Sequence, residues 1–129
     1  MQLRRFNHAA VRVPGQGILA IGGCSGIEDW LADVDLLQLS DEDEDVISWR
    51  QMAPMLQPKK RPSACHFRGF VFVCSRDSDD LDLCSFDVAA GVAGQWTRIV
   101  CPFRYAGWRH LLPLKGSLWI IGNLNAPFI

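Results

Sequence analysis

The sequence predicts an all-β fold of about two and a half four-stranded antiparallel units. Short runs rich in Val, Ile, Leu, Phe and Trp recur along the chain, each bounded by Gly, Pro, Ser, Asp or Asn, which is typical of strands joined by turns. Similar segments also return after about 47 residues, a length that suits a four-stranded repeat and exceeds most helical ones.

Ten strands are expected from these runs. They cover residues 7–13, 17–22, 33–39, 47–52, 63–68, 70–75, 81–87, 95–100, 107–113 and 117–122. Most have the length usual in antiparallel sheets. One alternative is a helix over residues 27–39, where apolar residues fall three or four positions apart.

The composition favours an ordinary folded protein with a packed core. Of the 129 residues, 49% are hydrophobic and 21% charged. The net charge of -1 provides no general attraction to phosphate, which dominates nucleic-acid binding. The sequence shows no membrane-length apolar run, and residues 1–10 lack the apolar stretch of a signal peptide. We therefore expect a cytoplasmic protein without nucleic-acid or membrane partners.

The repeat is clearest around two tryptophans, Trp49 and Trp96. Residues 34–39 align with residues 81–86 at a shift of 47, and the same shift places Trp49 on Trp96 without a gap. A repeated large aromatic side chain is suited to packing one sheet on the next. The alignment therefore predicts that the two indoles occupy equivalent buried positions.

The same shift relates two further segments. Residues 69–73 align with residues 116–120, while residues 17–23 form the first copy, displaced by extra residues in the turn at 14–16. The three copies span residues 1–56, 57–103 and 104–129.

The first copy resembles the kelch repeat. An apolar strand ending in Gly22-Gly23 is followed by an apolar strand over 34–39, then Trp49, then Met-Ala-Pro-Met at 52–55, and then Arg61. The second copy has Ser75-Arg76 and the third Gly122-Asn123 in place of the double glycine. A kelch repeat forms one blade of a β-propeller. The resemblance therefore implies an incomplete kelch β-propeller with 1–56 and 57–103 as blades 1 and 2 and 104–129 as a partial blade 3.

A propeller needs at least four blades to close. The third copy contains only two of the expected strands, so the sequence predicts a fragment or isoform of a larger ring, with the missing blades supplied by the same or another chain. The edge of strand 117–122 and the uncovered flank of the first blade are expected to make the isolated chain poorly soluble or self-associating.

The remaining polar motifs favour neither a metal nor a cofactor. The acidic runs at 41–45 and 77–82 lack the ligand spacing of a calcium loop and are expected to be solvated. His8, His66 and His110 do not superpose in the repeat alignment, so a shared metal site is a weak alternative.

The five cysteines, which are odd in number and unpaired in spacing, are expected to be free thiols: Cys24, Cys65, Cys74, Cys84 and Cys101. A redox role for Cys65, next to His66, is the alternative. No nucleophile elbow, catalytic triad or phosphate-binding lysine loop is present, so we do not expect an enzyme.

What remains is protein binding. The kelch resemblance implies that a partner is held by the loops on one rim of the propeller. The residues carried onto that rim are Arg5, Ser25, Trp30, Arg61, Arg76, Asp77, Ser78, Arg104, Tyr105 and Asn123. For Arg5 and Arg61, the alternative is a packing role between blades.

The resemblance implies a protein-interaction fragment, similar to the substrate-recognition part of cullin ubiquitin-ligase adaptors or to actin-binding proteins. One alternative is a truncated product without function. Another is a fragment of a kelch-propeller sugar enzyme, which a chain with Tyr105 as its single tyrosine fits poorly.

Overall fold

The computed structural model describes residues 4–39, 47–59, 61–75, 83–99, 109–122 and 126–127. Within these residues the chain forms β-strands and no helix. The strands are β1 (Ala9–Val13), β2 (Gly17–Ile21), β3 (Val34–Leu39), β4 (Ile47–Gln51), β5 (Pro62–Phe67), β6 (Phe70–Ser75), β7 (Leu83–Asp87), β8 (Gln95–Ile99), β9 (Arg109–Leu114), β10 (Ser117–Gly122) and β11 (Ala126–Pro127). The all-β prediction is confirmed for this part of the chain. The alternative helix over 27–39 is wrong, because β3 pairs with strands on both sides.

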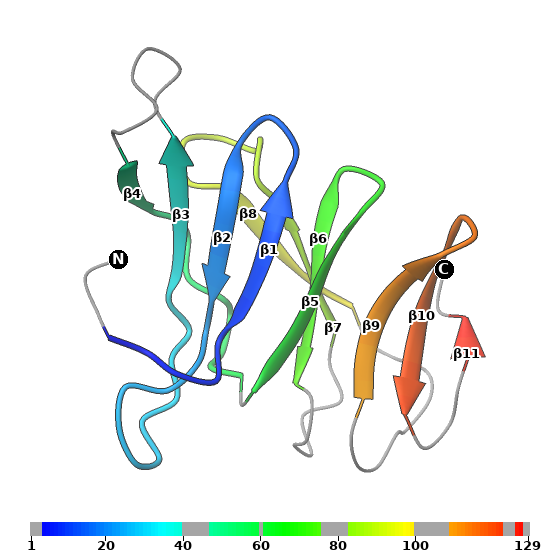
Figure 1. Ribbon diagram of the computed structural model, residues 1–129, viewed down its shortest axis with the longest axis horizontal. Coiled ribbons are helices and arrows are strands. Elements are labelled where there is room, and N and C mark those ends of the chain that lie inside the picture. Colours follow the sequence, from blue (N-terminus) through cyan, green and yellow to red (C-terminus); the bar gives the residue numbers. More distant parts are fainter. Residues whose placement is uncertain are drawn as a thin grey trace.

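The strands form three antiparallel sheets, in which neighbours in sequence are neighbours in space. Sheet 1 has the order β1-β2-β3-β4, sheet 2 the order β5-β6-β7-β8, and sheet 3 the order β9-β10-β11. Figure 1 shows β1, β5 and β9, the first strand of each sheet, as successive neighbours, and β5 contacts both β1 and β9. The three sheets are therefore arranged side by side in chain order, and their first strands are adjacent to one another.

Each sheet has two faces, because successive side chains of a strand point to opposite sides. We call the face that meets the next sheet along the chain the forward face, and the opposite one the rear face. The forward face of sheet 1 includes Val11, Leu19 and Leu36, which share one buried apolar cluster with Phe86 and Trp96 on the rear face of sheet 2.

Sheets 2 and 3 pack in the same way. The forward face of sheet 2 contributes Phe67 and Phe72 to a second buried cluster, and the rear face of sheet 3 contributes Leu111, Leu118 and Ile120. Forward face on rear face is thus the packing rule at both sheet-to-sheet contacts of the described structure.

Two hairpins show the 47-residue repeat directly. Arg68-Gly69 joins β5 to β6 and Lys115-Gly116 joins β9 to β10. All four residues have positive φ, from 48° to 83°, as a two-residue type I′ turn requires. The first hairpin instead has a three-residue turn, because Val13 pairs with Gly17. The turn at 14–16 is thus one residue longer than the other two, but it does not cause the displacement of residues 17–23, and that expectation is wrong. The extra length comes after β2, because the paired residues Ile18 and Leu37 are 19 positions apart and the equivalent residues Val71 and Phe86 only 15.

Strand pairing confirms that Trp49 and Trp96 are equivalent in position. Trp49 lies opposite Leu37, which lies opposite Ile18. Trp96 lies opposite Phe86, which in turn lies opposite Val71. The counterpart of Phe86 is therefore Leu37, two residues earlier than the alignment of 34–39 with 81–86 predicts. The chain between the paired residues is two residues longer in sheet 1, and a shift of two keeps each side chain on its face.

Candidate functional site

The two ends of the sheets differ in the segments they carry. Because antiparallel strands reverse direction, alternate connections lie at opposite ends. One end, the lower edge of Figure 1, carries the segment before β1, the β2–β3 loop (22–33) and the β4–β5 segment (52–61), and we call it the loop end. The other end carries the tight hairpin turns, and we call it the turn end.

Four of the predicted partner-binding residues are described, and all four lie at the loop end: Arg5, Ser25, Trp30 and Arg61. The others lie outside the described residues: Arg76, Asp77, Ser78, Arg104, Tyr105 and Asn123.

The base of the β2–β3 loop is fixed by backbone contacts. Cys24 exchanges two backbone hydrogen bonds with Phe6, at 2.9 and 3.0 Å, and the Leu31 N–H donates to the carbonyl of Gly23 at 2.8 Å. Gly23 has a φ of 95°, and a Cβ there would lie 2.8 Å from the carbonyl oxygen of Phe6. Glycine is therefore required at position 23, both by its φ and by this close approach.

The tip of this loop is exposed and has its own polar contacts. The Ser25 hydroxyl donates to a carboxylate oxygen of Asp29, and the Ser25 N–H donates to the Asp29 carbonyl at 3.1 Å. Ile27 is 97% exposed at the tip, while Trp30 is half-buried and pairs with Cys24. The sequence places Ile27 in the predicted loop, but nothing in the pattern singles it out as the protruding residue.

Next to this loop lies the β4–β5 segment. Met55 donates its backbone N–H to the carbonyl of Ala32 at 2.8 Å. Met55 and Pro62 also lie against Gly22, where a Cβ would meet them at 3.1 and 3.3 Å. The two segments therefore form one continuous surface at the loop end. Arg61 is half-buried beside it, with a φ of 42°.

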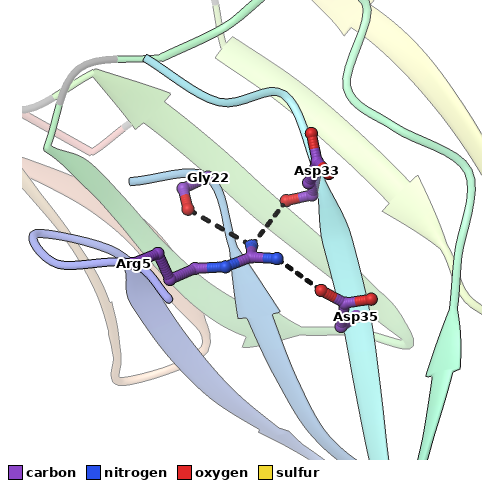
Figure 2. A network of polar contacts seen from close by, with 4 residues as sticks. All are labelled: Arg5, Gly22, Asp33 and Asp35. Carbon is purple, nitrogen blue, oxygen red and sulfur yellow. Dashed lines mark hydrogen bonds and ion pairs between the residues drawn. The ribbon is translucent and has the colours of Figure 1, made fainter. Parts of the chain in front are cut away.

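Arg5 lies inside the protein, as Figure 2 shows. Its guanidinium donates to the carbonyls of Gly22 and Asp33, at 3.3 and 3.0 Å, and forms an ion pair with Asp35. The side chain is fully buried. The buried guanidinium thus ties the N-terminal segment to β2 and β3, which is a packing role within sheet 1 and not the expected one between blades.

Two features of the described residues bear on a metal or small-molecule site. No group of three or more His, Cys, Asp or Glu among them is arranged to hold a metal. A shallow pocket of about 620 Å³ lies at the turn end, lined by Arg12, Val13, Gly15, Gln16, Gly17, Ile18 and Gln38. Its lining has no acid, histidine or cysteine to act as a base or nucleophile.

Cys65 is a poor candidate for redox chemistry. It lies in the apolar cluster between sheets 2 and 3. Burial raises the pKa of its thiol from 9.0 to about 11, so the reactive thiolate is scarce at neutral pH. The redox alternative for Cys65 is therefore corrected to a structural thiol, because desolvation outweighs any effect of the adjacent His66.

A scan of protein-family models gives no match to the chain, and neither does a search of curated proteins. In the part of the chain that the structure describes, no helix has the length and apolar character to cross a membrane.

Proposed function

We propose that this chain is part of a kelch-type β-propeller that binds another protein through its loop end. The observation that carries the proposal is the repeated sheet packing. Sheets 1 and 2 are four-stranded meanders, forward faces pack on rear faces, and the first strands lie together. Propeller blades are arranged around their axis in this way. The kelch motif around Gly22-Gly23 and Trp49 adds the sequence support.

The loop end has the composition of a small protein-binding surface. Ile27 provides an exposed apolar side chain, Trp30 a half-buried aromatic ring, and Ser25, Glu28 and Asp29 a polar rim. Interfaces combine such an apolar centre with a polar border. The fixed base of the loop reduces the entropy that binding would otherwise cost. A partner with an apolar pocket and basic residues beside it fits this tip best.

Within the kelch family resemblance, two partner classes follow. The chain would serve either as the substrate-recognition part of a cullin ubiquitin-ligase adaptor or as an actin-binding module.

The test compares two exposed apolar residues at opposite ends of the sheets. Ile27→Glu changes the loop end, and Val92→Glu changes the β7–β8 turn, where Val92 is 86% exposed. The wild type and both variants are used to capture proteins from cytosolic extract, and captured proteins are then purified and titrated directly. Filamentous actin is tested separately by co-sedimentation.

We expect Ile27→Glu to weaken partner binding at least about tenfold, a loss typical of an anchor residue, while Val92→Glu binds like the wild type. Arg61→Glu should also lower affinity more than it lowers the melting temperature. If the loop-end variants bind every purified partner as tightly as the wild type does, the loop end is not the binding surface.

A further inference from the structure

The rear face of sheet 1 has an open apolar row, which exposed Arg12 on β1 continues opposite Ile18. Ile18, Leu37 and Trp49 lie directly opposite one another across three strands of this face. Ile18 and Trp49 are exposed and Leu37 is half-buried, and Ile47 is exposed on the same face of β4. We call Ile18, Leu37 and Trp49 the rear row of sheet 1.

The same row is covered in sheet 2. Val71, Phe86 and Trp96 occupy the equivalent positions and all are buried. Phe86 and Trp96 stack with their ring centroids 4.5 Å apart, and the Trp96 Nε1–H donates to the carbonyl of Ala53 at 2.8 Å. The rear row of sheet 2 is therefore covered by the forward face of sheet 1 together with the β4–β5 segment.

Sheet 3 has an open forward face. Leu112 and Leu114 on β9 are exposed, and Trp119 and Ile121 on β10 are half-buried. The residues 47 positions earlier are Cys65, Phe67, Phe72 and Cys74, and these are buried against sheet 3. The forward face of sheet 3 is thus apolar at the same positions as the forward face of sheet 2, which packs on the rear face of sheet 3.

We propose that two copies of this chain associate head to tail, with the forward face of sheet 3 of each copy packing on the rear row of sheet 1 of the other. At both sheet-to-sheet contacts of the described structure, a forward face packs on a rear face. The described structure leaves one rear face open, on sheet 1, and one forward face open, on sheet 3. The proposal rests on the propeller architecture of the proposed function but not on any partner at the loop end.

Two copies are favoured by the number of sheets. A head-to-tail contact between different faces either closes into a ring or continues as a filament. The described residues of each copy form three sheets, so a closed pair places six of these sheets around the axis, within the range that propellers use. The loop ends of both copies then lie on the same rim, which leaves the proposed binding surface free.

The experiment is sedimentation velocity of the 129-residue chain with one variant for each open face. Trp49→Arg places a charge on the rear row, and Leu114→Arg places the same charge on the forward face of sheet 3. Val92→Arg is the matched control, because the β7–β8 turn lies on neither open face. Circular dichroism of each variant checks that the sheets are retained.

The wild type and Val92→Arg are expected to form a species of twice the 14.4 kDa monomer mass, and each single open-face variant should weaken the pair at least about tenfold. Mixing Trp49→Arg with Leu114→Arg should give more dimer than either variant alone but less than the wild type. One of the two contacts in the mixed pair is intact, because it joins the forward face of sheet 3 in Trp49→Arg to the rear row in Leu114→Arg, whereas the other contact carries both substitutions.

Three results would overturn the proposal. One is a wild type that stays monomeric across the concentration range. Another is a ladder of ever larger species, which would mean that the contact does not close. The third is a mixture of the two variants that associates no more strongly than either variant alone, which would contradict contact between these two faces. None of these results depends on whether the loop end binds a partner, so the two proposals fail separately.

Discussion

At the scale of single residues, Trp49 and Trp96 occupy equivalent positions in two sheets but differ in burial. Trp96 is 8% exposed and Trp49 is 42% exposed, although both stand at the same place in their sheets. The difference lies in the neighbour, since sheet 1 covers Trp96 and no described segment covers Trp49. The expectation of equivalent positions is confirmed, and the expectation that both are buried is wrong for Trp49.

Truncation of these two residues should have unequal effects. Trp96→Ala removes the stack on Phe86 and the hydrogen bond to Ala53, and should lower the free energy of unfolding by about 3–5 kcal/mol. Trp49→Ala should cost less than about 1 kcal/mol, the usual range for exposed sites. Urea unfolding at low protein concentration measures both. Equal losses would show that the two sites are energetically alike.

The buried ion pair gives a second prediction. Arg5→Met leaves the Asp35 carboxylate buried without its cation, which should cost about 3–5 kcal/mol. The double variant Arg5→Met/Asp35→Leu should recover much of that loss, because no unpaired charge remains. Both are measured by urea unfolding. A double variant as unstable as the single one would mean that the hydrogen bonds of Arg5 to Gly22 and Asp33, rather than the charge pair, carry the effect.

Cys65 should make stability sensitive to alkaline pH. Burial raises the pKa of its thiol to about 11 from 9.0. Between those pH values the unfolded thiol loses its proton while the folded thiol keeps it, so stability is highest below pH 9 and falls as the pH rises toward 11. Cys65→Ala should flatten part of this decline in unfolding measured from pH 8 to 11. An unchanged slope would show that Cys65 makes no contribution.

At the scale of elements, the sequence predicts the strands well and their faces less well. The ten expected strands all overlap observed ones, because alternating apolar residues and turn residues such as Gly69 and Gly116 are local signals. An eleventh strand, β11, was not expected, and it pairs with part of the β10 edge that the sequence predicts to be unpaired. Which residue of sheet 1 is equivalent in position to Phe86 of sheet 2 is not a local property. It depends on how many residues separate β3 from β4, and a gapless alignment has no information on that length.

The site was predictable to a similar degree. The kelch resemblance places Ser25 and Trp30 in the loop after the second strand, and both lie in the observed β2–β3 loop. The resemblance does not indicate that Arg5 is buried. The burial of Arg5 arises from Asp35, which lies thirty residues away in sequence and becomes a neighbour only in the folded sheet.

The hairpin turns provide a stability prediction. Lys115 has a φ of 50°, where asparagine is favoured in a type I′ turn. Lys115→Asn should therefore stabilise the chain by about 0.5–1 kcal/mol. Arg68→Asn at the equivalent position should gain less, because Arg68 donates to the Gly116 carbonyl at 2.8 Å and lies over the Phe67 ring. Thermal unfolding of both variants tests this, and a larger gain at Arg68 would contradict it.

At the scale of the whole molecule, the open faces predict a concentration-dependent stability. If two copies cover each other's rear row and forward face, association stabilises the folded state by mass action. The melting temperature of the wild type should rise as the protein concentration increases, while that of Trp49→Arg should stay constant. Differential scanning fluorimetry over a hundredfold concentration series measures both. A wild-type melting temperature that does not change with concentration would contradict the prediction.

The hydrogen bond from Trp96 to Ala53 also implies an order in time. A chain leaves the ribosome with its N-terminus first, and Ala53 lies forty-three residues ahead of Trp96. The acceptor of this hydrogen bond therefore emerges before its donor, and the forward face of sheet 1 emerges before the sheet that packs on it.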